Sequence, residues 1–182
     1  IEKDLKKFSK ERKMELILPS LYSELEGDAL PKIVSEISKT NYLSHIIIGL
    51  DRANKSQAQK AWKFFKKIKT PFTILWNDGP KLKRLNDELK KKDLAPSQHG
   101  KGRNVWYCLG MCIARDEARS VALHDCDIKT YDRRMLAKLF YPVVNPLFNF
   151  EFCKGYYPRV AQNKMGGRVA SCLLYTSPSP RD

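Results

Sequence analysis

The chain has 182 residues, of which 42% are hydrophobic and 30% are charged. This length and composition predict one substantial hydrophobic core and argue against an intrinsically disordered protein. No stretch approaches the roughly 18 to 20 consecutive apolar residues of a membrane helix, so we expect no membrane association and a cytoplasmic location. The formal net charge of +14 favours an anionic partner.

The positive charge leaves two interpretations open. A nucleic-acid-binding domain would use it, but the lysines are spread along predicted helix faces, without interleaved aromatics, an RNP-like pattern or a zinc finger. We therefore favour a solvated lysine-rich surface and expect no nucleic-acid partner. The five cysteines have the spacing of neither a disulfide framework nor a zinc site, which indicates reduced, buried thiols.

The first half of the chain alternates short apolar runs with amphipathic stretches. In chain order we expect a strand at residues 14–18, a helix at 30–37 with Asp28 as N-cap, a strand at 45–50, a helix at 58–68 and a strand at 72–76. Each strand is a continuous apolar run. Continuous apolar strands that alternate with helices are typical of a parallel sheet covered on both faces.

The second half continues this alternation. We expect a charged helix at 81–92, a loop at 95–102, a helix at 104–114, a strand at 120–124 and a helix at 132–141, followed by a loop at Pro142 and an aromatic-rich extended segment at 148–157. Residues 172–182 (CLLYTSPSPRD) differ in character and resemble a translated sequencing adapter. We therefore expect the natural sequence to stop near residue 171 and exclude the tail from functional reasoning.

Three polar segments follow predicted strands, at residues 19–24, 51–53 and 125–127. In open parallel sheets, ligands bind beyond the carboxyl ends of the strands. Asp125 and Asp127 could both reach one hard divalent cation such as Mg²⁺ or Mn²⁺, although this spacing also occurs in solvated turns. Gly100-Lys101-Gly102-Arg103 stands where a loop enters a helix, a position that suits an anion.

Six strings in one order resemble the glucosyl-3-phosphoglycerate synthase family. They are PSLYSE (19–24), GLD (49–51), GKGRNVW (100–106), DCDI (125–128), FCKGYYPR (152–159) and GGRV (166–169). The resemblance implies an α/β fold of the GT-A glycosyltransferase type, Rossmann-like, with a mostly parallel sheet and helices on both faces, incomplete at the C-terminus. It also implies a metal-dependent retaining enzyme that transfers glucose from UDP-glucose to D-3-phosphoglycerate, a step towards a compatible solute.

The resemblance assigns roles to residues. Donor binding falls to Pro19, Leu21, Glu24, Asp51, Lys101 and Asp125, the Mg²⁺ or Mn²⁺ ligand is Asp127, and acceptor binding falls to Tyr156, Gly167 and Arg168. No catalytic nucleophile is assigned, because in retaining transfer of this kind the leaving diphosphate can itself take the acceptor proton. Residues 1–171 would form the nucleotide-sugar-binding domain with the start of the acceptor region, and the family also suggests a homodimer.

Two departures from the family bear on these expectations. Ala170 stands where the family usually has threonine after GGRV, and the chain ends before a downstream histidine that completes the family's metal site. The alternatives are a related transferase that uses GDP-mannose or another acceptor, a part that binds nucleotide without catalysis, and the nucleic-acid-binding domain. His124 adjoins the predicted site, but we expect it to be structural.

Overall fold

The computed structural model describes residues 1–96, 98–155, 159–161 and 164–166. Its main sheet is parallel, with the strand order β3-β2-β1-β4. These strands are β1 (Met14–Leu21), β2 (Leu43–Asp51), β3 (Phe72–Trp76) and β4 (Ser120–Leu123). A second, antiparallel pair consists of β5 (Arg159–Ala161) and β6 (Lys164–Gly166). The described helices include none long and apolar enough to cross a membrane.

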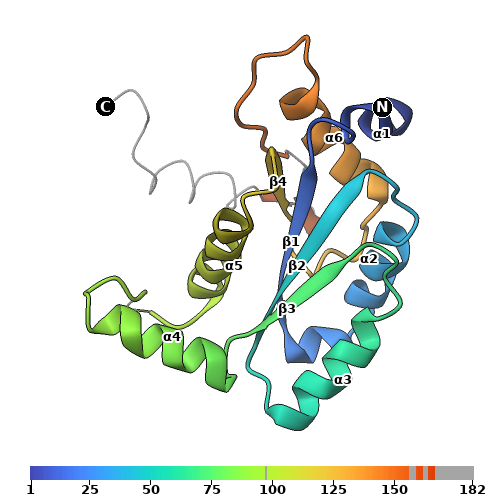
Figure 1. Ribbon diagram of the computed structural model, residues 1–182. Coiled ribbons are helices and arrows are strands. Elements are labelled where there is room, and N and C mark those ends of the chain that lie inside the picture. The colour runs from blue at the N-terminus through green and yellow to red at the C-terminus, as the bar shows by residue number, and fades with distance from the viewer. Residues whose placement is uncertain (97, 156–158, 162–163, 167–182) are drawn as a thin grey trace.

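Helices cover both faces of the main sheet, as the strand pattern predicted (Figure 1). On one face, α2 (Ala29–Ile37), α3 (Lys55–Phe65) and α6 (Arg133–Val144) pack with alternate strand residues in the larger core. On the other, α5 (Lys101–Arg115) packs through Cys108 and Cys112 on Ile17 and Ile47. The alternation of side chains along each strand separates the two cores.

Strand β1 extends three residues beyond the predicted end at residue 18, through Pro19 to Leu21. The Ile17 carbonyl accepts a hydrogen bond from the His124 backbone N–H at 3.1 Å, so Ile17 faces β4. Pro19, two residues later, faces the same side, where β4 has already ended at Leu123. The missing proline N–H therefore costs no ladder hydrogen bond, and the strand continues along β2.

Two helix boundaries also differ from the prediction. Helix α3 begins at Lys55, three residues early, because Asn54 and Gln57 form a reciprocal capping box with hydrogen bonds of 2.9 and 2.8 Å. Helix α6 continues through Pro142 to Val144, where a loop was expected. Phe140 and Val144 are buried on either side of the proline, so packing holds this last turn.

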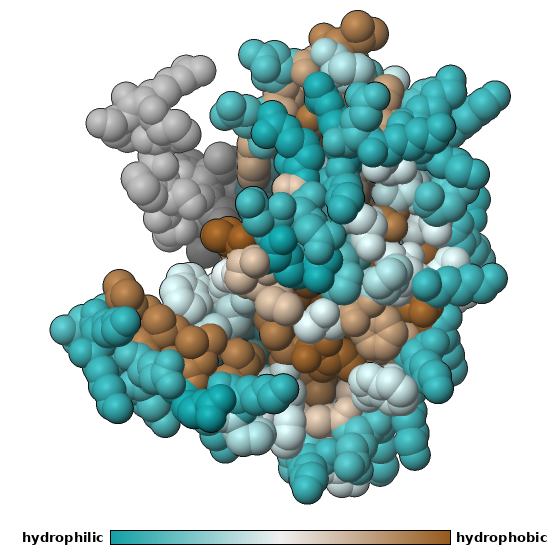
Figure 2. All heavy atoms as spheres, viewed as in Figure 1, coloured by the Kyte–Doolittle hydropathy of each residue, from teal (hydrophilic) through white to brown (hydrophobic). Residues whose placement is uncertain are grey.

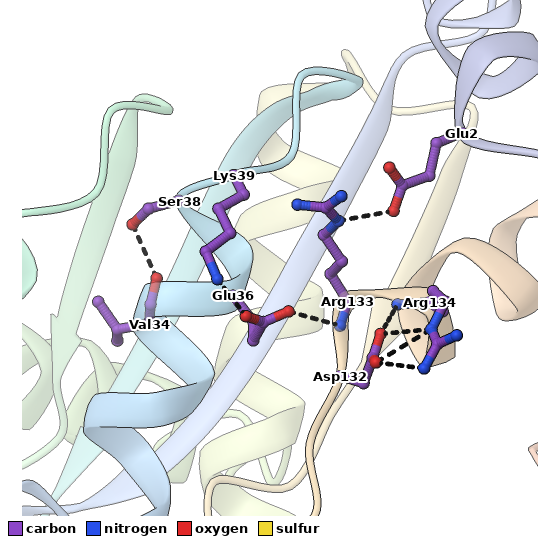
Figure 3. Close-up of polar contacts among 8 residues, drawn as sticks. All are labelled: Glu2, Val34, Glu36, Ser38, Lys39, Asp132, Arg133 and Arg134. Atoms are coloured by element: carbon purple, nitrogen blue, oxygen red, sulfur yellow. Dashed lines mark hydrogen bonds and ion pairs between the residues drawn. The ribbon is translucent and has the colours of Figure 1, made fainter.

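Helix α1 (Glu2–Phe8) was not predicted, and a charged cluster attaches it to the fold. The Arg133 Nε atom donates to Glu2 at 2.9 Å, and the Arg133 backbone N–H donates to Glu36 of α2 at 3.4 Å (Figure 3). Asp132 caps α6 by accepting from the Arg134 backbone N–H at 2.8 Å. Leu5 is fully buried and the Phe8 ring packs against Tyr141, so these apolar contacts and the charged cluster hold α1 against α6.

Helix α4 (Pro80–Lys90) differs from the other helices because none of its residues is buried. It begins one residue before the predicted start at residue 81, and its apolar side, which includes Leu85, stays partly open to solvent. Figure 2 shows this apolar surface along α4 at the lower left. The Tyr107 hydroxyl donates to Asn86 at 2.6 Å and ties α4 to α5.

Candidate functional site

A pocket of about 240 Å³ lies at the carboxyl ends of β1 and β2. Its walls come from the end of β1 and the turn η1 (Tyr22–Glu26), from the segment after β2, from the start of α5, and from residues 126–127 after β4. Among the residues predicted for the donor and metal, those that line it are Pro19, Leu21, Glu24, Asp51, Lys101 and Asp127. Segments up to about a hundred residues apart in sequence thus meet in one place.

Glu24 is held against the wall of the pocket by the turn that it closes. Its carboxylate accepts the backbone N–H of Leu21 at 2.9 Å, three residues back. Burial raises the pKa of Glu24, the negative charge of Asp127 adds to the increase, and hydrogen bonds from Leu21 and Ser20 oppose it. Glu24 is thus within the electrostatic reach of both Asp127 and Lys101, whose charges shift its pKa in opposite directions.

Asp51 ends β2 and is almost wholly buried. Its carboxylate pairs with the Arg103 guanidinium at 3.5 Å, and both side chains are at most 11% exposed. A buried carboxylate needs such a partner. This pair was not predicted, because Arg103 resembles one more cation in a basic string. The signal that could have found it is its place one turn before Tyr107, which is buried.

Gly49 brings β2 and α5 close together just below the pocket. The Asn104 side chain, which is buried and lines the pocket, donates to the Gly49 carbonyl at 2.8 Å. A Cβ atom at Gly49 would lie 1.8 Å from Asn104 Oδ1 and 2.7 Å from Cys108 Sγ. Glycine is therefore required here, and the position of Asn104 in the site was not predicted.

Helix α5 begins at Lys101, three residues earlier than predicted, with Gly100 as its N-cap. The φ angle of Gly100 is 137°, a conformation that residues with a Cβ rarely adopt. Gly100 and Lys101 line the pocket, so the N-terminus of α5 lies at its wall, a position that favours an anion. The Lys101 ammonium forms an ion pair with Asp125, so Asp125 is part of the site although it does not itself line the pocket.

The Asp125-Cys126-Asp127 segment divides between core and pocket. Cys126 is buried in the larger core and also reaches the pocket wall, and its burial raises the pKa of the thiol. His124, just before it, is buried and stacks edge-on against Tyr131 with ring centroids 5.3 Å apart. Burial lowers the pKa of His124 to about 4. The ring thus packs as a neutral core side chain, as expected.

The metal prediction depends on Asp127, whose carboxylate type and position fit one ligand of a hard divalent cation. Within the described residues, no group of three or more His, Cys, Asp and Glu side chains could hold a metal ion. Asp127 would therefore need diphosphate oxygens and further ligands. The predicted acceptor residues Tyr156, Gly167 and Arg168 lie outside the described residues.

Several pocket residues were given no role from the sequence, although the first, second and fourth lie in the predicted strand-end segments: Ser20, Arg52, Asn104 and Cys126. Arg52 directly follows Asp51, and Cys126 lies between two assigned aspartates, so proximity to assigned residues was the signal that could have found them. Ser20 and Asn104 lie within the quoted strings without a charge that would single them out.

Comparison with known proteins identifies relatives of the chain. No family model matches it. It is 46% identical over 176 residues to a glucosyl-3-phosphoglycerate synthase from Persephonella marina and 40% identical over 161 residues to one from Methanococcoides burtonii. These alignments cover 97% and 87% of the chain, but 43% and 39% of the relatives. The chain thus spans less than half the length of the relatives that it matches.

A solved structure has the same fold. It is the crystal structure of glucosyl-3-phosphoglycerate synthase from Mycobacterium tuberculosis in complex with Mn²⁺, UDP and glucosyl-3-phosphoglycerate, with a TM-score of 0.53 at 15% identity. The match covers 80% of this chain and 44% of that chain. It confirms the predicted GT-A fold. The two curated relatives, at 46% and 40% identity, place the chain in the glucosyl-3-phosphoglycerate synthase family.

Proposed function

We propose that the chain is the nucleotide-sugar-binding part of a metal-dependent retaining glucosyltransferase that transfers glucose from UDP-glucose to D-3-phosphoglycerate. The observation that carries the proposal is the pocket, which joins Glu24, Asp51, Lys101 and Asp127 at the carboxyl ends of the strands. The names of the two relatives support the reaction, and the Mn²⁺, UDP and product in the distant structure support the ligand classes.

Several residues of the pocket have a task in this proposal. Asp51, held by Arg103, would accept a hydrogen bond from the nucleoside, and Leu21 and Glu24 would also contact it. Lys101 and the N-terminus of α5 would hold the diphosphate. Lys101 would then exchange Asp125 for phosphate oxygens, which would free Asp125 for sugar or ribose hydroxyls.

Asp127 would hold the divalent cation, Mg²⁺ or Mn²⁺. Bound there, the metal would supply positive charge that stabilises the departing nucleoside diphosphate. The Asp127 charge that raises the pKa of Glu24 supports this position, because a cation would relieve the repulsion between the two carboxylates. Gly167, Arg168 and Tyr156 remain our proposal for the acceptor side, and a cytoplasmic location and a homodimer remain predictions.

Calorimetry on the purified chain tests the donor site. We expect MnCl₂ to tighten UDP-glucose binding at least tenfold, and we expect Asp127→Asn to abolish this effect of the metal. Asp87→Asn is the matched control, since Asp87 is exposed on α4 and outside the pocket. The control should retain the full metal effect.

The same titrations separate the alternatives. Tighter binding of GDP-mannose than of UDP-glucose would favour the related transferase, and the absence of metal-dependent binding of any sugar nucleotide would contradict the donor site. Salt-sensitive binding to DNA that Asp127→Asn leaves unchanged would support the nucleic-acid-binding domain instead. Glucose transfer from UDP-glucose to 3-phosphoglycerate, followed by product analysis, tests the full reaction.

A further inference from the structure

Arg52 adopts a backbone conformation that is costly for arginine. Its φ angle is 54°, in the left-handed region that glycine enters freely and other residues at a cost. The residues on both sides of Arg52 are held by contacts of their own. Asp51 ends β2 and pairs with Arg103, while Ala53 donates its N–H to Asp78 at 3.0 Å and accepts from the Trp76 indole at 2.7 Å.

The Arg52 side chain lines the pocket and is exposed to solvent. It has no hydrogen-bond or ion-pair partner within the described part of the chain. Arg103, by contrast, is buried with its charge directed at Asp51. Of these two arginines, Arg52 is thus the one that can donate to a ligand, at a position where glycine would fit the backbone better.

Asp51 and Arg52 both line the pocket and follow each other in the sequence, so an acceptor and a donor stand next to each other along the chain. The edge of uracil carries an N–H donor beside a carbonyl acceptor, so it matches this order. Cytosine has the reverse order, with a ring nitrogen acceptor beside an amino donor. A guanidinium that loses solvent on binding a carbonyl makes a charge-assisted hydrogen bond, which is stronger than a neutral one.

We propose that Arg52 is a specificity-determining residue that donates to the C4 carbonyl of uracil while Asp51 accepts from the neighbouring ring N–H. This inference rests on the proposed function, because it requires that the pocket bind a uridine nucleotide. It adds a residue that reads the base and explains why arginine occupies a left-handed position. Arg52 thereby contributes to the choice of UDP-glucose over donors with other bases.

The test compares UDP and CDP binding to the unchanged chain and to Arg52→Gly by calorimetry in MnCl₂. We expect Arg52→Gly to weaken UDP binding about tenfold, the effect of one charge-assisted hydrogen bond, and to change CDP binding less than twofold. The thermal midpoint should stay the same or rise, because glycine relieves the backbone cost. Asp116→Gly is the matched control: Asp116 has a φ of 48° at the end of α5, is exposed and lies outside the pocket.

The outcomes separate the two proposals. If the unchanged chain does not bind UDP, the proposed function fails. If it binds UDP and Arg52→Gly binds equally well, only the role of Arg52 is refuted. An equal loss for UDP and CDP would mean that Arg52 contacts the phosphates or ribose, and this too would overturn base reading. Loss of UDP affinity in Asp116→Gly would show that backbone relief alone causes the effect.

Discussion

Gly49 marks the place where a single atom would disturb both the fold and the pocket. A methyl group there would overlap Asn104 Oδ1 at 1.8 Å and Cys108 at 2.7 Å, and both partners are buried. We expect Gly49→Ala to lower the free energy of unfolding by about 2 to 3 kcal/mol, the usual cost of overpacking a tight core. UDP-glucose affinity should fall as well, because Asn104 lines the pocket.

Gly110 provides the matched control for Gly49. It lies in the middle of α5, and a Cβ atom there would meet nothing within 4 Å. Gly110→Ala should therefore raise the free energy of unfolding by about 0.5 to 1 kcal/mol, as expected for glycine replaced by alanine inside a helix. Urea denaturation of both variants measures the difference. Similar stabilities for the two variants would contradict the close approach of β2 and α5.

At the scale of elements, the last turn of α5 is fastened to the start of β1 by a buried ion pair. Arg115 donates to Glu15 at 3.1 Å, and the Glu15 side chain is fully buried. Arg115→Met would leave a buried carboxylate without its partner, so we expect a loss of about 3 to 5 kcal/mol in unfolding free energy at pH 7. Glu15→Met combined with Arg115→Met should recover much of that loss.

Glu117 offers the control for this pair. It also contacts Arg115, at 3.1 Å, but it is 44% exposed. Exposed ion pairs contribute little, so Glu117→Gln should change the unfolding free energy by less than about 1 kcal/mol. A comparable loss in Glu117→Gln and Arg115→Met, measured by urea denaturation, would contradict the assignment of the buried carboxylate as the cause.

The strands were predictable because each contains a short, mostly apolar run, and β3 matches its prediction residue for residue. Helix α1 was missed because Leu5 is its one buried residue, too little for a visible pattern. The three strand-end segments of the pocket followed from topology. The pairing of Arg103 with Asp51 did not, because it depends on how α5 crosses β2, and neither local spacing nor composition encodes that crossing.

At the scale of the whole molecule, two buried histidines make the stability of the fold sensitive to acid. Burial lowers the pKa of His124 to about 4 and also lowers the pKa of His45, which hydrogen-bonds to Thr73 at 2.9 Å. At pH values between the lowered pKa of the folded state and the ordinary pKa of 6.5, the unfolded chain binds more protons than the folded chain does. The free energy of unfolding should therefore be constant with respect to these groups above pH 6.5 and fall as the pH drops towards 4.

His124→Phe isolates the larger of these contributions. Phenylalanine can keep the edge-on contact with Tyr131, but it does not titrate. Between pH 7 and pH 4.5, we expect the unchanged chain to lose about 2 to 3 kcal/mol more unfolding free energy than His124→Phe, the amount that a shift from 6.5 to about 4 implies. Urea denaturation at the two pH values measures this difference.

His99→Asn is the control. His99 is exposed, so this variant should keep the pH dependence of the unchanged chain. Parallel losses in the unchanged chain and His124→Phe would mean that His124 is not held neutral by burial, and the acid sensitivity would then have to come from other groups.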